Sequence, residues 1–599
     1  MKLSIVTNLN DSGPGSFRQS IIDSNNSNSN VQFPSVLKSH ESHINNLLTK
    51  YTVDEKDRSL IVFLIKGTIK LDSSLPNITS SVIILSIPEI FPVTIDCNFN
   101  EGLTFAKNSA FSIVIGITFK NSCSNGLNLH DDGNLIVLCT FTENNENGIL
   151  ITSKQNYIGL NPENLSVFTA NTISYNKENG IKLYKSSDNT IIKNRILHNR
   201  KNGIYFEYSS NNTIGGTVYT NADGETNNPT GSENTTTPVF IIPPLGNQIS
   251  NNHHNGVYLY KKSNINTFNG NFIGTSYDGN KAKGNGLNGV LIEKSHSNIF
   301  KGCDLNQDPF VYYNVVSGNK LNGFHIHDSN GTIIQGNFSG INSQNSTSVA
   351  NSQNGLLVSG ISKDTTVGGP IPLGNNFSGN NRNGIKISDQ ASKFISYNSF
   401  CGLAAFGGAV PNGKNGMHIT SSGLQIQIRT NVLSGNLGNG IKLSKNANHI
   451  NLDPNLCGTN SKGDSALPNK GSGLVISGRA NNNFIGSQVS SVIPNSTFSG
   501  NLGNGITIKE SAHDNVIYHC NIGLSTVGNA PIKNGKLAIL LTDSCYQNVI
   551  VDSKIDGNVL LNECAKNNKL IANPIDVDSQ IIDKSKKFNF IIHYNQKHL

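Results

Sequence analysis

The chain has 599 residues, and only 14% of them are charged, against about 25% in typical soluble domains. Its formal net charge of +7 is spread thinly, without a basic stripe that carries interleaved aromatic residues, which argues against nucleic-acid binding. No apolar run approaches ~20 residues, so we expect no membrane span.

The N-terminal residues predict a short helix that caps a larger structure. Ser16 and Gln19 have the spacing of a capping box, and Phe17 and Ile21 share one face of the helix that would follow. Such a helix can cover the unpaired strands and exposed core at the open end of a solenoid. The segment after it, 23–43, is rich in Asn and Ser and predicts a surface loop.

From residue 60 onward the chain is dominated by a repeat. Strand-like runs at 60–65, 81–85 and 111–119 come first, and then the phrase Asn-Gly, apolar, any residue, apolar recurs. Its copies begin at Asn125, Asn147, Asn179, Asn202, Asn255, Asn288, Asn322, Asn354, Asn383, Asn415, Asn439 and Asn504. We expect each Asn-Gly pair to supply the positive φ angles of a tight turn, and the alternating residues to form a strand with one buried face.

The spacing of the copies predicts a parallel β-helix. The shortest intervals are 22 to 24 residues, which suits one coil of three short strands and three turns. Stacked coils then pair each strand with its equivalent one coil away. A longer period, Ser-Gly-Asn followed by Asn-Gly at 317–323, 378–384, 434–440 and 499–505, indicates that two coils form one super-repeat.

Two sequence motifs resemble those of a known group of proteins. The opening Val-Thr-Asn-Leu-Asn-Asp-Ser-Gly-Pro-Gly-Ser-Phe-Arg-Gln at 6–19 is similar to the first motif of a large group of right-handed parallel β-helix repeat proteins with a pectin-lyase-like fold. Segments such as Asn-Phe-Ile-Gly-Thr-Ser-Tyr-Asp-Gly at 271–279 and Asn-Thr-Ile-Gly-Gly at 212–216 resemble its repeats. The resemblance covers roughly residues 3–560. It implies a fold, whereas a fold hosts many functions.

Together these patterns predict an all-β fold, a single right-handed parallel β-helix of roughly sixteen coils with an N-terminal capping helix. The expected parts are an N-terminal cap and polar loop at 1–59, the β-helix at 60–564 and a tail at 565–599. A stretch rich in Thr, Asn, Gly and Pro at 217–246 predicts a loop insertion in the β-helix. The lysine-bearing tail suits either a C-terminal cap or an assembly segment.

Cysteine usage and the N-terminus bear on the cellular setting. The nine cysteines are odd in number and contain no Cys-x-x-Cys, which argues against a disulfide framework or a metal cluster. We expect reduced thiols in the coil interior, as in a reducing compartment. Because the cap motif follows Met1 at once and no apolar leader is visible, we expect a chain that stays inside its cell or is packaged in a virus particle.

Outward positions on consecutive strands predict a ligand-binding face. In each Asn-Gly phrase the side chains between the apolar residues point outward, and stacking aligns them into a ladder. Part of this ladder combines aromatic rings, which stack on sugars, with carboxylates and imidazoles, which bind hydroxyl groups. The predicted glycan-binding residues are Tyr184, Tyr205, Glu207, Tyr258, Tyr260, Glu293, His325 and His327.

The same residues allow other interpretations. Tyr, Lys and Thr are favoured on any exposed strand, so an inert ladder is one of them, and the chain has no Trp for sugar stacking. Glu207 and Glu293, two coils apart, would lie about 9.6 Å apart, at the upper edge for an inverting glycosidase. Lys182 beside Glu207 would suit a lyase. The cluster of His325, His327 and Asp328 lacks a clear further ligand for zinc.

We therefore expect a non-catalytic β-helical protein that serves as a structural or carbohydrate-binding element of a surface or particle. The alternative is a polysaccharide-active enzyme, a lyase or glycoside hydrolase of the pectin-lyase-like type. The expected partners are a polysaccharide or other glycan and a second copy of the chain. No catalytic residue, metal ligand or cofactor is assigned.

Overall fold

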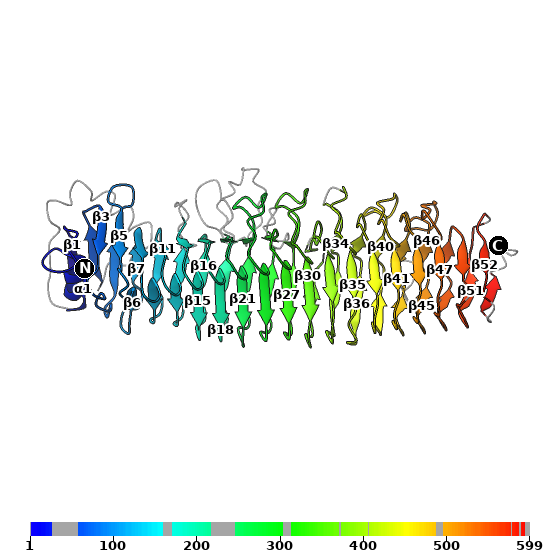
Figure 1. Cartoon of the computed structure of the whole chain (residues 1–599), viewed down its shortest axis with the longest axis horizontal. Helices are drawn as coiled ribbons and strands as arrows, with labels where there is room; N and C mark the ends of the chain where they lie inside the picture. Colours follow the sequence, from blue (N-terminus) through cyan, green and yellow to red (C-terminus); the bar gives the residue numbers. More distant parts are fainter. Residues whose placement is uncertain are drawn as a thin grey trace, which may run out of the picture. The chain divides into compact units, whose positions relative to one another are not determined.

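The computed structural model describes residues 2–26, 58–159, 170–216, 246–302, 313–370, 373–404, 407–486, 495–562, 564–576, 578–585 and 589–593. The chain forms two compact units, and both are built from short strands (Figure 1). The first unit is Met1–Gly274 with Gly284–Leu287, and the second is Thr275–Lys283 with Asn288–Leu599. Among the described residues, no helix has the length and apolar character needed to cross a membrane.

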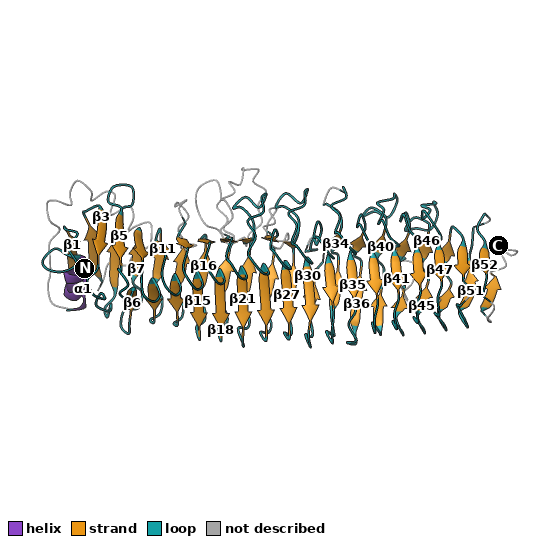
Figure 2. Ribbon diagram, viewed as in Figure 1, coloured by secondary structure: helices purple, strands orange, loops and turns teal. Residues whose placement is uncertain are grey.

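Both units consist of short strands in three parallel sheets, A, B and C (Figure 2). In the first unit, sheet A contains β1 (Lys2–Val6), β2 (Ser59–Phe63), β4 (Val82–Leu85), β7 (Ile113–Ile115), β10 (Leu135–Val137), β13 (Tyr157–Gly159), β16 (Thr190–Ile192), β19 (Thr213–Gly215) and β22 (Thr267–Asn269). Sheet B contains β3 (Gly67–Lys70), β5 (Val93–Asp96), β8 (Ile117–Lys120), β11 (Thr140–Thr142), β14 (Thr172–Ser174), β17 (Arg195–Leu197), β20 (Gln248–Ser250) and β23 (Phe272–Ile273). Sheet C contains β6 (Leu103–Phe105), β9 (Leu127–Leu129), β12 (Ile149–Ile151), β15 (Ile181–Tyr184), β18 (Ile204–Glu207) and β21 (Val257–Tyr260).

The second unit repeats this plan. Its sheet A contains β25 (Ile299–Lys301), β28 (Ile333–Gln335), β31 (Thr366–Val367), β33 (Ile395–Tyr397), β36 (Ile426–Arg429), β39 (Ile450–Leu452), β42 (Phe484–Ile485), β45 (Val516–Tyr518), β48 (Val549–Val551), β51 (Lys569–Asn573) and β53 (Phe590–His593). Sheet B contains β26 (Asn314–Val316), β29 (Asn337–Phe338), β34 (Phe400–Cys401), β37 (Val432–Leu433), β40 (Leu456–Cys457), β43 (Thr497–Phe498), β46 (Asn521–Ile522) and β49 (Lys554–Ile555). Sheet C contains β24 (Val290–Glu293), β27 (Phe324–His327), β30 (Leu356–Ser359), β32 (Ile385–Ile387), β35 (Met417–Ile419), β38 (Ile441–Leu443), β41 (Leu474–Ile476), β44 (Ile506–Ile508), β47 (Ile539–Leu541), β50 (Val559–Leu561) and β52 (Ile581–Asp583).

Consecutive coils pair in parallel and in register, which confirms the predicted β-helix. Ile385 on β32 lies opposite Met417 on β35, which lies opposite Ile441 on β38, so Ile385 and Ile441 share one sheet as expected. Strands β21 and β27 of sheet C, for example, alternate buried and half-exposed side chains, because successive residues of a strand face opposite sides. The predicted core residues are all fully buried: Val257, Leu259, Val290, Ile292, Phe324, Ile326, Ile385 and Ile387.

Columns of buried asparagines hold the turns of successive coils together. In one column of the second unit, each side-chain Nδ2 donates to the Oδ1 of the next asparagine at 2.9–3.1 Å, through Asn319, Asn351, Asn380, Asn412, Asn436, Asn469, Asn501 and Asn534. The same oxygen also accepts a backbone N–H, as when Asn380 N–H donates to Asn412 Oδ1 at 3.0 Å. Buried amides are stable only when hydrogen-bonded in this way.

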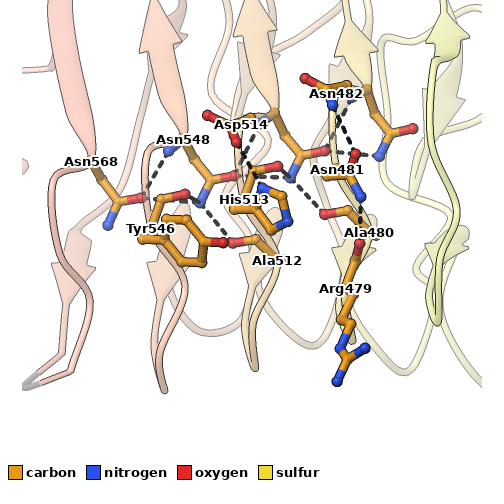
Figure 3. Close-up of polar contacts among 12 residues, drawn as sticks. Arg479, Ala480, Asn481, Asn482, Ala512, His513, Asp514, Tyr546, Asn548 and Asn568 are labelled. Atoms are coloured by element: carbon orange, nitrogen blue, oxygen red, sulfur yellow. Dashed lines mark hydrogen bonds and ion pairs between the residues drawn. The ribbon is translucent and has the colours of Figure 1, made fainter.

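A second asparagine column appears in Figure 3. Asn548 Nδ2 donates to Asn568 Oδ1 at 3.0 Å and to the carbonyls of Ala512 and Tyr546, both at 3.1 Å. One side chain therefore connects three coils. Beside this column the rings of His513 and Tyr546 stack with centroids 4.7 Å apart.

The Asn-Gly pairs have a different role from the one expected. Among the described residues, neither residue of these pairs has a positive φ, so the prediction of a left-handed turn is wrong. Their asparagines form another ladder, in which Asn383 donates to Asn354 at 2.8 Å and Asn354 to Asn322 at 2.9 Å. Each glycine is required because a Cβ atom has no room. At Gly384 it would lie 2.7 Å from the carbonyl oxygens of both Gly416 and Phe377.

The N-terminal helix α1 (Phe17–Asn25) caps the first coils, as predicted. Phe17 and Ile21 are fully buried, and the Phe17 ring lies 5.0 Å from that of Phe63 on β2. Ser16 Oγ accepts the Gln19 N–H at 3.2 Å, which is one half of a capping box. The other half is absent from the described contacts, because Gln19 Nε2 donates to Asp23 Oδ1 and the Ser16 N–H donates to Gly13 O.

Arg18 on α1 is a structural residue that sequence reasoning missed. Its guanidinium pairs with Asp11 at 2.6 Å and donates to the carbonyls of Ser73 and Ser74 at 2.7 and 2.6 Å. The side chain therefore fastens the cap to the opening motif and to a turn more than fifty residues later.

The cysteines are mostly interior, as expected. Six of the described ones are buried, whereas Cys123 and Cys564 are exposed and depart from the prediction, and Cys303 lies outside the described residues. Burial raises the pKa of the Cys97 and Cys139 thiols to about 12, so both stay protonated at neutral pH.

Several predicted segments fall largely outside the described residues. They are the loop insertion 217–246, of which only Gly246 is described, and the polar loop 23–43 after residue 26. Within 565–599, β51 and β52 pair with β48 and β50. The predicted domain boundaries and the capping or assembly role of the tail stay predictions.

We expect Gly384→Ala to destabilise the second unit by about 2 kcal/mol, because the new methyl group meets two fixed backbone oxygens. Thermal unfolding measures the change. Gly408→Ala is the matched control, since a Cβ at Gly408 meets nothing within 4 Å. Equal melting temperatures for the two variants would contradict the steric role.

Ile326→Asp should lower the free energy of unfolding by at least about 3 kcal/mol, because it places an unpaired charge in the interior. Urea unfolding gives the value. Leu540→Asp, at a half-exposed position on β47, serves as control and should change stability much less. The inward assignment fails if both variants unfold at the same urea concentration.

Candidate functional site

Outward side chains on three neighbouring C strands of the first unit form one surface. Strands β15, β18 and β21 pair in register, so these side chains stack into two columns. One column is Lys182, Tyr205 and Tyr258, and the other is Tyr184, Glu207 and Tyr260. All of them are half-exposed and alternate with buried residues. The predicted site residues among them, Tyr184, Tyr205, Glu207, Tyr258 and Tyr260, are called the tyrosine patch below.

Three rings of the tyrosine patch, those of Tyr205, Tyr258 and Tyr260, form a chain of contacts. Tyr258 lies between Tyr205 and Tyr260, with ring centroids 5.4 Å from each. Tyr184 meets Tyr208 edge-on at 6.5 Å. These separations fall within the favourable range for aromatic pairs. The patch is thus an ordered aromatic surface rather than a set of independent side chains.

Lysines surround these rings. Lys182 Nζ lies 5.7 Å from the ring centre of Tyr184 and 5.9 Å from that of Tyr205, and Lys185 Nζ lies 5.1 Å from Tyr184. Lys261 Nζ lies 4.8 Å from the Tyr260 ring and 3.8 Å from Glu207 Oε1. The neighbouring Tyr260 is the main cause of a raised pKa at Lys261. Around these rings, three positively charged ammonium groups therefore outnumber one carboxylate.

Lys185, Tyr208 and Lys261 are the residues of this surface that sequence reasoning missed. Each directly follows the outward pair of its strand and ends it with a φ of 51°, 54° or 43°. The prediction considered only alternating positions within the strands. These three residues come after the strands, and their positive φ angles direct the side chains toward the patch. A large polar residue directly after each of these strands was the sequence signal that could have identified them.

The other predicted site residues, Glu293, His325 and His327, belong to the second unit. Strands β24, β27 and β30 pair so that Glu293 lies opposite His327, which lies opposite Ser359. The predicted pairing of Glu207 with Glu293 stays a prediction. Among the outward positions of β15, β18 and β21, all of which are described, Glu207 is the only carboxylate.

Ser359 joins the two histidines. Its Oγ lies 2.9 Å from His325 Nε2 and 3.0 Å from His327 Nδ1. A hydroxyl has one hydrogen, so at most one of the two imidazoles can accept from Ser359 Oγ, and at least one must donate to it. His327 Nε2 in turn lies 3.5 Å from Asp328 Oδ2.

Ser359, His325 and His327 are called the histidine relay below. They have the residue types of a serine nucleophile and its base. Burial, reinforced by the charge of His327, lowers the pKa of His325 to about 4, so this ring is neutral at pH 7. Ser359, however, is only 6% exposed, which leaves its hydroxyl little access to a substrate. The described residues contain no group of three or more His, Cys, Asp or Glu side chains placed to hold a metal ion.

Comparison with known proteins supports the fold. A family described as "Right handed beta helix region" matches residues 101–273. The right-handed parallel β-helix is thereby shown. No curated protein matches the sequence significantly.

Solved structures with a similar fold include the periplasmic alginate epimerase AlgG, at 10% identity over 88% of this chain and 79% of that one, with a TM-score of 0.25. The A-module of the Azotobacter vinelandii mannuronan C-5 epimerase AlgE6 matches at 10% identity over 90% and 93% of the two chains, with a TM-score of 0.20. The catalytic domain of a GH87 alpha-1,3-glucanase matches at 10% identity over 92% and 66%, with a TM-score of 0.22. Likeness at this level carries no argument about activity.

The histidine relay predicts a pH effect on stability. His325 has a lower pKa in the folded chain, about 4, than its ordinary 6.5, so the unfolded state binds more protons between these values. Stability should fall as the pH drops from 6.5 to 4, with His325 contributing up to about 3 kcal/mol of the loss. Urea unfolding of His325→Gln across this range should give a flatter pH profile.

Exposed His449→Gln is the control and should keep the wild-type profile. A profile for His325→Gln as steep as that of the wild type would contradict the assignment. His418, whose pKa burial also lowers to about 4, should leave part of the slope in place.

Proposed function

We propose that this chain is a non-catalytic β-helical protein that binds carbohydrate through the tyrosine patch of its first unit. The observation that carries the proposal is the mutual contact of Tyr205, Tyr258 and Tyr260 on outward positions of adjacent strands. Aromatic rings of this kind offer an apolar surface with a hydroxyl at its edge, which matches the two chemical faces of a sugar ring.

Order in the free protein supports a binding role. Each ring is held by its neighbours and by the lysines around it, so little side-chain freedom is left to lose when a ligand binds. Preorganisation of this kind increases affinity without adding contacts. A repeated surface also offers equivalent positions to successive units of a polymer.

The charge around the patch favours acidic glycans. Lys182, Lys185 and Lys261 contribute three ammonium groups near the rings, and the single carboxylate, Glu207, is already paired with Lys261. Carboxylate or sulfate groups of a polysaccharide would complement this excess. The ligand class that we propose is therefore an acidic polysaccharide.

The same geometry supports a role without catalysis. Hydrolysis of glycosides requires two carboxylates on either side of the bond, and Glu207 stands alone among the described outward residues of the three patch strands. The serine of the histidine relay is buried. We propose that the chain acts as a structural, glycan-binding element of a surface or particle.

Replacing Tyr258 and Tyr260 together with alanine should weaken binding to an acidic polysaccharide about 30-fold, at about 1 kcal/mol for each lost stacking contact. The measurement is a glycan array with acidic and neutral polysaccharides, followed by titration calorimetry on the best ligand. Tyr157→Ala, which removes an exposed tyrosine from sheet A of the same unit, is the control.

Unchanged affinity in the folded double variant would reject the patch. The array should be run beside a degradation screen with the same polysaccharides. Release of new chain ends or of unsaturated products by the wild-type protein would overturn the non-catalytic proposal in favour of an enzyme.

A further inference from the structure

A pocket of about 330 Å³ lies in the second unit, on sheet B. Its volume is within the range of small-molecule sites. Its apolar lining includes Tyr313, Phe338, Phe400 and Val432. None of these belongs to the tyrosine patch or to the histidine relay.

The base of the pocket is a column of outward residues. Phe338 lies opposite Asn376, Asn376 opposite Phe400, and Phe400 opposite Val432. Their chain neighbours Phe377, Cys401 and Leu433 are fully buried in the coil interior. Since successive residues of a strand face opposite sides, the column faces outward, where it would ordinarily meet solvent.

Aromatic rings form one wall. Tyr313 stacks on Phe338 with ring centroids 3.9 Å apart and an interplanar angle of 27°. Burial raises the pKa of Tyr313, so its phenol keeps its proton at neutral pH. Together with Phe400 and Val432 these rings make an apolar surface of the kind that sugar rings stack against.

Asn376 interrupts this apolar column. It is 1% exposed, and its Nδ2 donates to Asn345 Oδ1 at 2.6 Å and to Leu403 O at 2.9 Å, which fixes the orientation of the amide. Its Oδ1 has no hydrogen-bond partner among the described residues. Asn376 lines the pocket, but its Oδ1 is itself buried and is not offered to a ligand there.

Among the described residues that line the pocket, none has a charged side chain. Phosphates, carboxylates and amines would therefore be buried there without a partner of opposite charge. The polar groups that remain are the amides of Asn345 and Asn398 and the hydroxyls of Thr430 and Ser461. This set matches an uncharged ligand with several hydroxyl groups.

We infer that this pocket binds a neutral saccharide unit, which packs an apolar ring face against the aromatic wall and forms hydrogen bonds with the amide of Asn398 and the hydroxyls of Thr430 and Ser461. The inference is independent of the proposed function, because it concerns a different surface and an uncharged ligand. The two sites would allow the chain to recognise a mixed polysaccharide or two different glycans.

The test is ligand-detected NMR and titration calorimetry with glucose, galactose, mannose, N-acetylglucosamine, cellobiose and maltose. At least one sugar should bind the wild-type chain with a Kd in the millimolar range or tighter. Phe400→Ala, which shortens the apolar wall, and Tyr313→Ala should each weaken that binding at least tenfold. Tyr518→Ala, on sheet A of the same unit, is the control and should bind normally.

Thermal unfolding of each variant checks that the second unit remains folded, and Tyr313→Ala serves if Phe400→Ala does not fold. The Tyr258→Ala, Tyr260→Ala double variant should bind the neutral sugar as well as the wild type does, which separates this site from the tyrosine patch. Absence of binding by the wild type, or binding that survives in every folded pocket variant, would overturn the inference.

Discussion

The asparagine ladder is the interaction on which the remaining structure depends. A β-helix coil must turn sharply several times within some twenty residues, and each turn leaves backbone groups without a partner inside the sheet. A side-chain amide offers both a donor and an acceptor, so one asparagine in each coil can satisfy its neighbours above and below. Asn436 does this by accepting from Asn412 and donating to Asn469 and to the carbonyl of Cys401. Because that role recurs in each coil, the residue recurs too, and strand register follows from it.

At each Asn-Gly pair, the asparagine ladder and the stacked glycines act together. The asparagines hydrogen-bond to each other across adjacent coils, and the glycines leave room for the coils to lie that close. Between Gly180 and the Gly203 carbonyl there is no space for a methyl group, since a Cβ there would lie 2.7 Å from that oxygen. The phrase is therefore a requirement for close packing between coils, although it has the letters of a turn signal. Outward-facing side chains do not hold the coils together, so they can differ from coil to coil. Both candidate sites lie on these outward faces.

Most of the features that the sequence predicted correctly are ones that repeat. Strand position and inward columns follow from periodicity, because every coil supplies the same information again, whereas the capping helix follows from the local pattern of Ser16, Phe17 and Ile21. The role of the Asn-Gly pair was misjudged, since local propensity favours a turn and says nothing of the coil above. Lys185 and Tyr208 were missed because they reach the patch from left-handed positions. The Ser359 relay needed the exact register of two coils, and the pocket around Asn376 joins residues from several coils and from the loops between their strands.

One consequence concerns how such a chain can change during evolution. The ladder bond from Asn202 to Asn179 spans 23 residues and measures 3.0 Å, whereas the bond from Asn255 to Asn202 spans 53 residues and measures 3.1 Å. The connection between two coils can thus more than double in length while the contact between them stays the same. The entropic cost of closing the longer segment is only about 1 kcal/mol. The connections between coils therefore tolerate insertions. Evolution or protein engineering can add sequence there, even a folded domain, without changing how the coils pack.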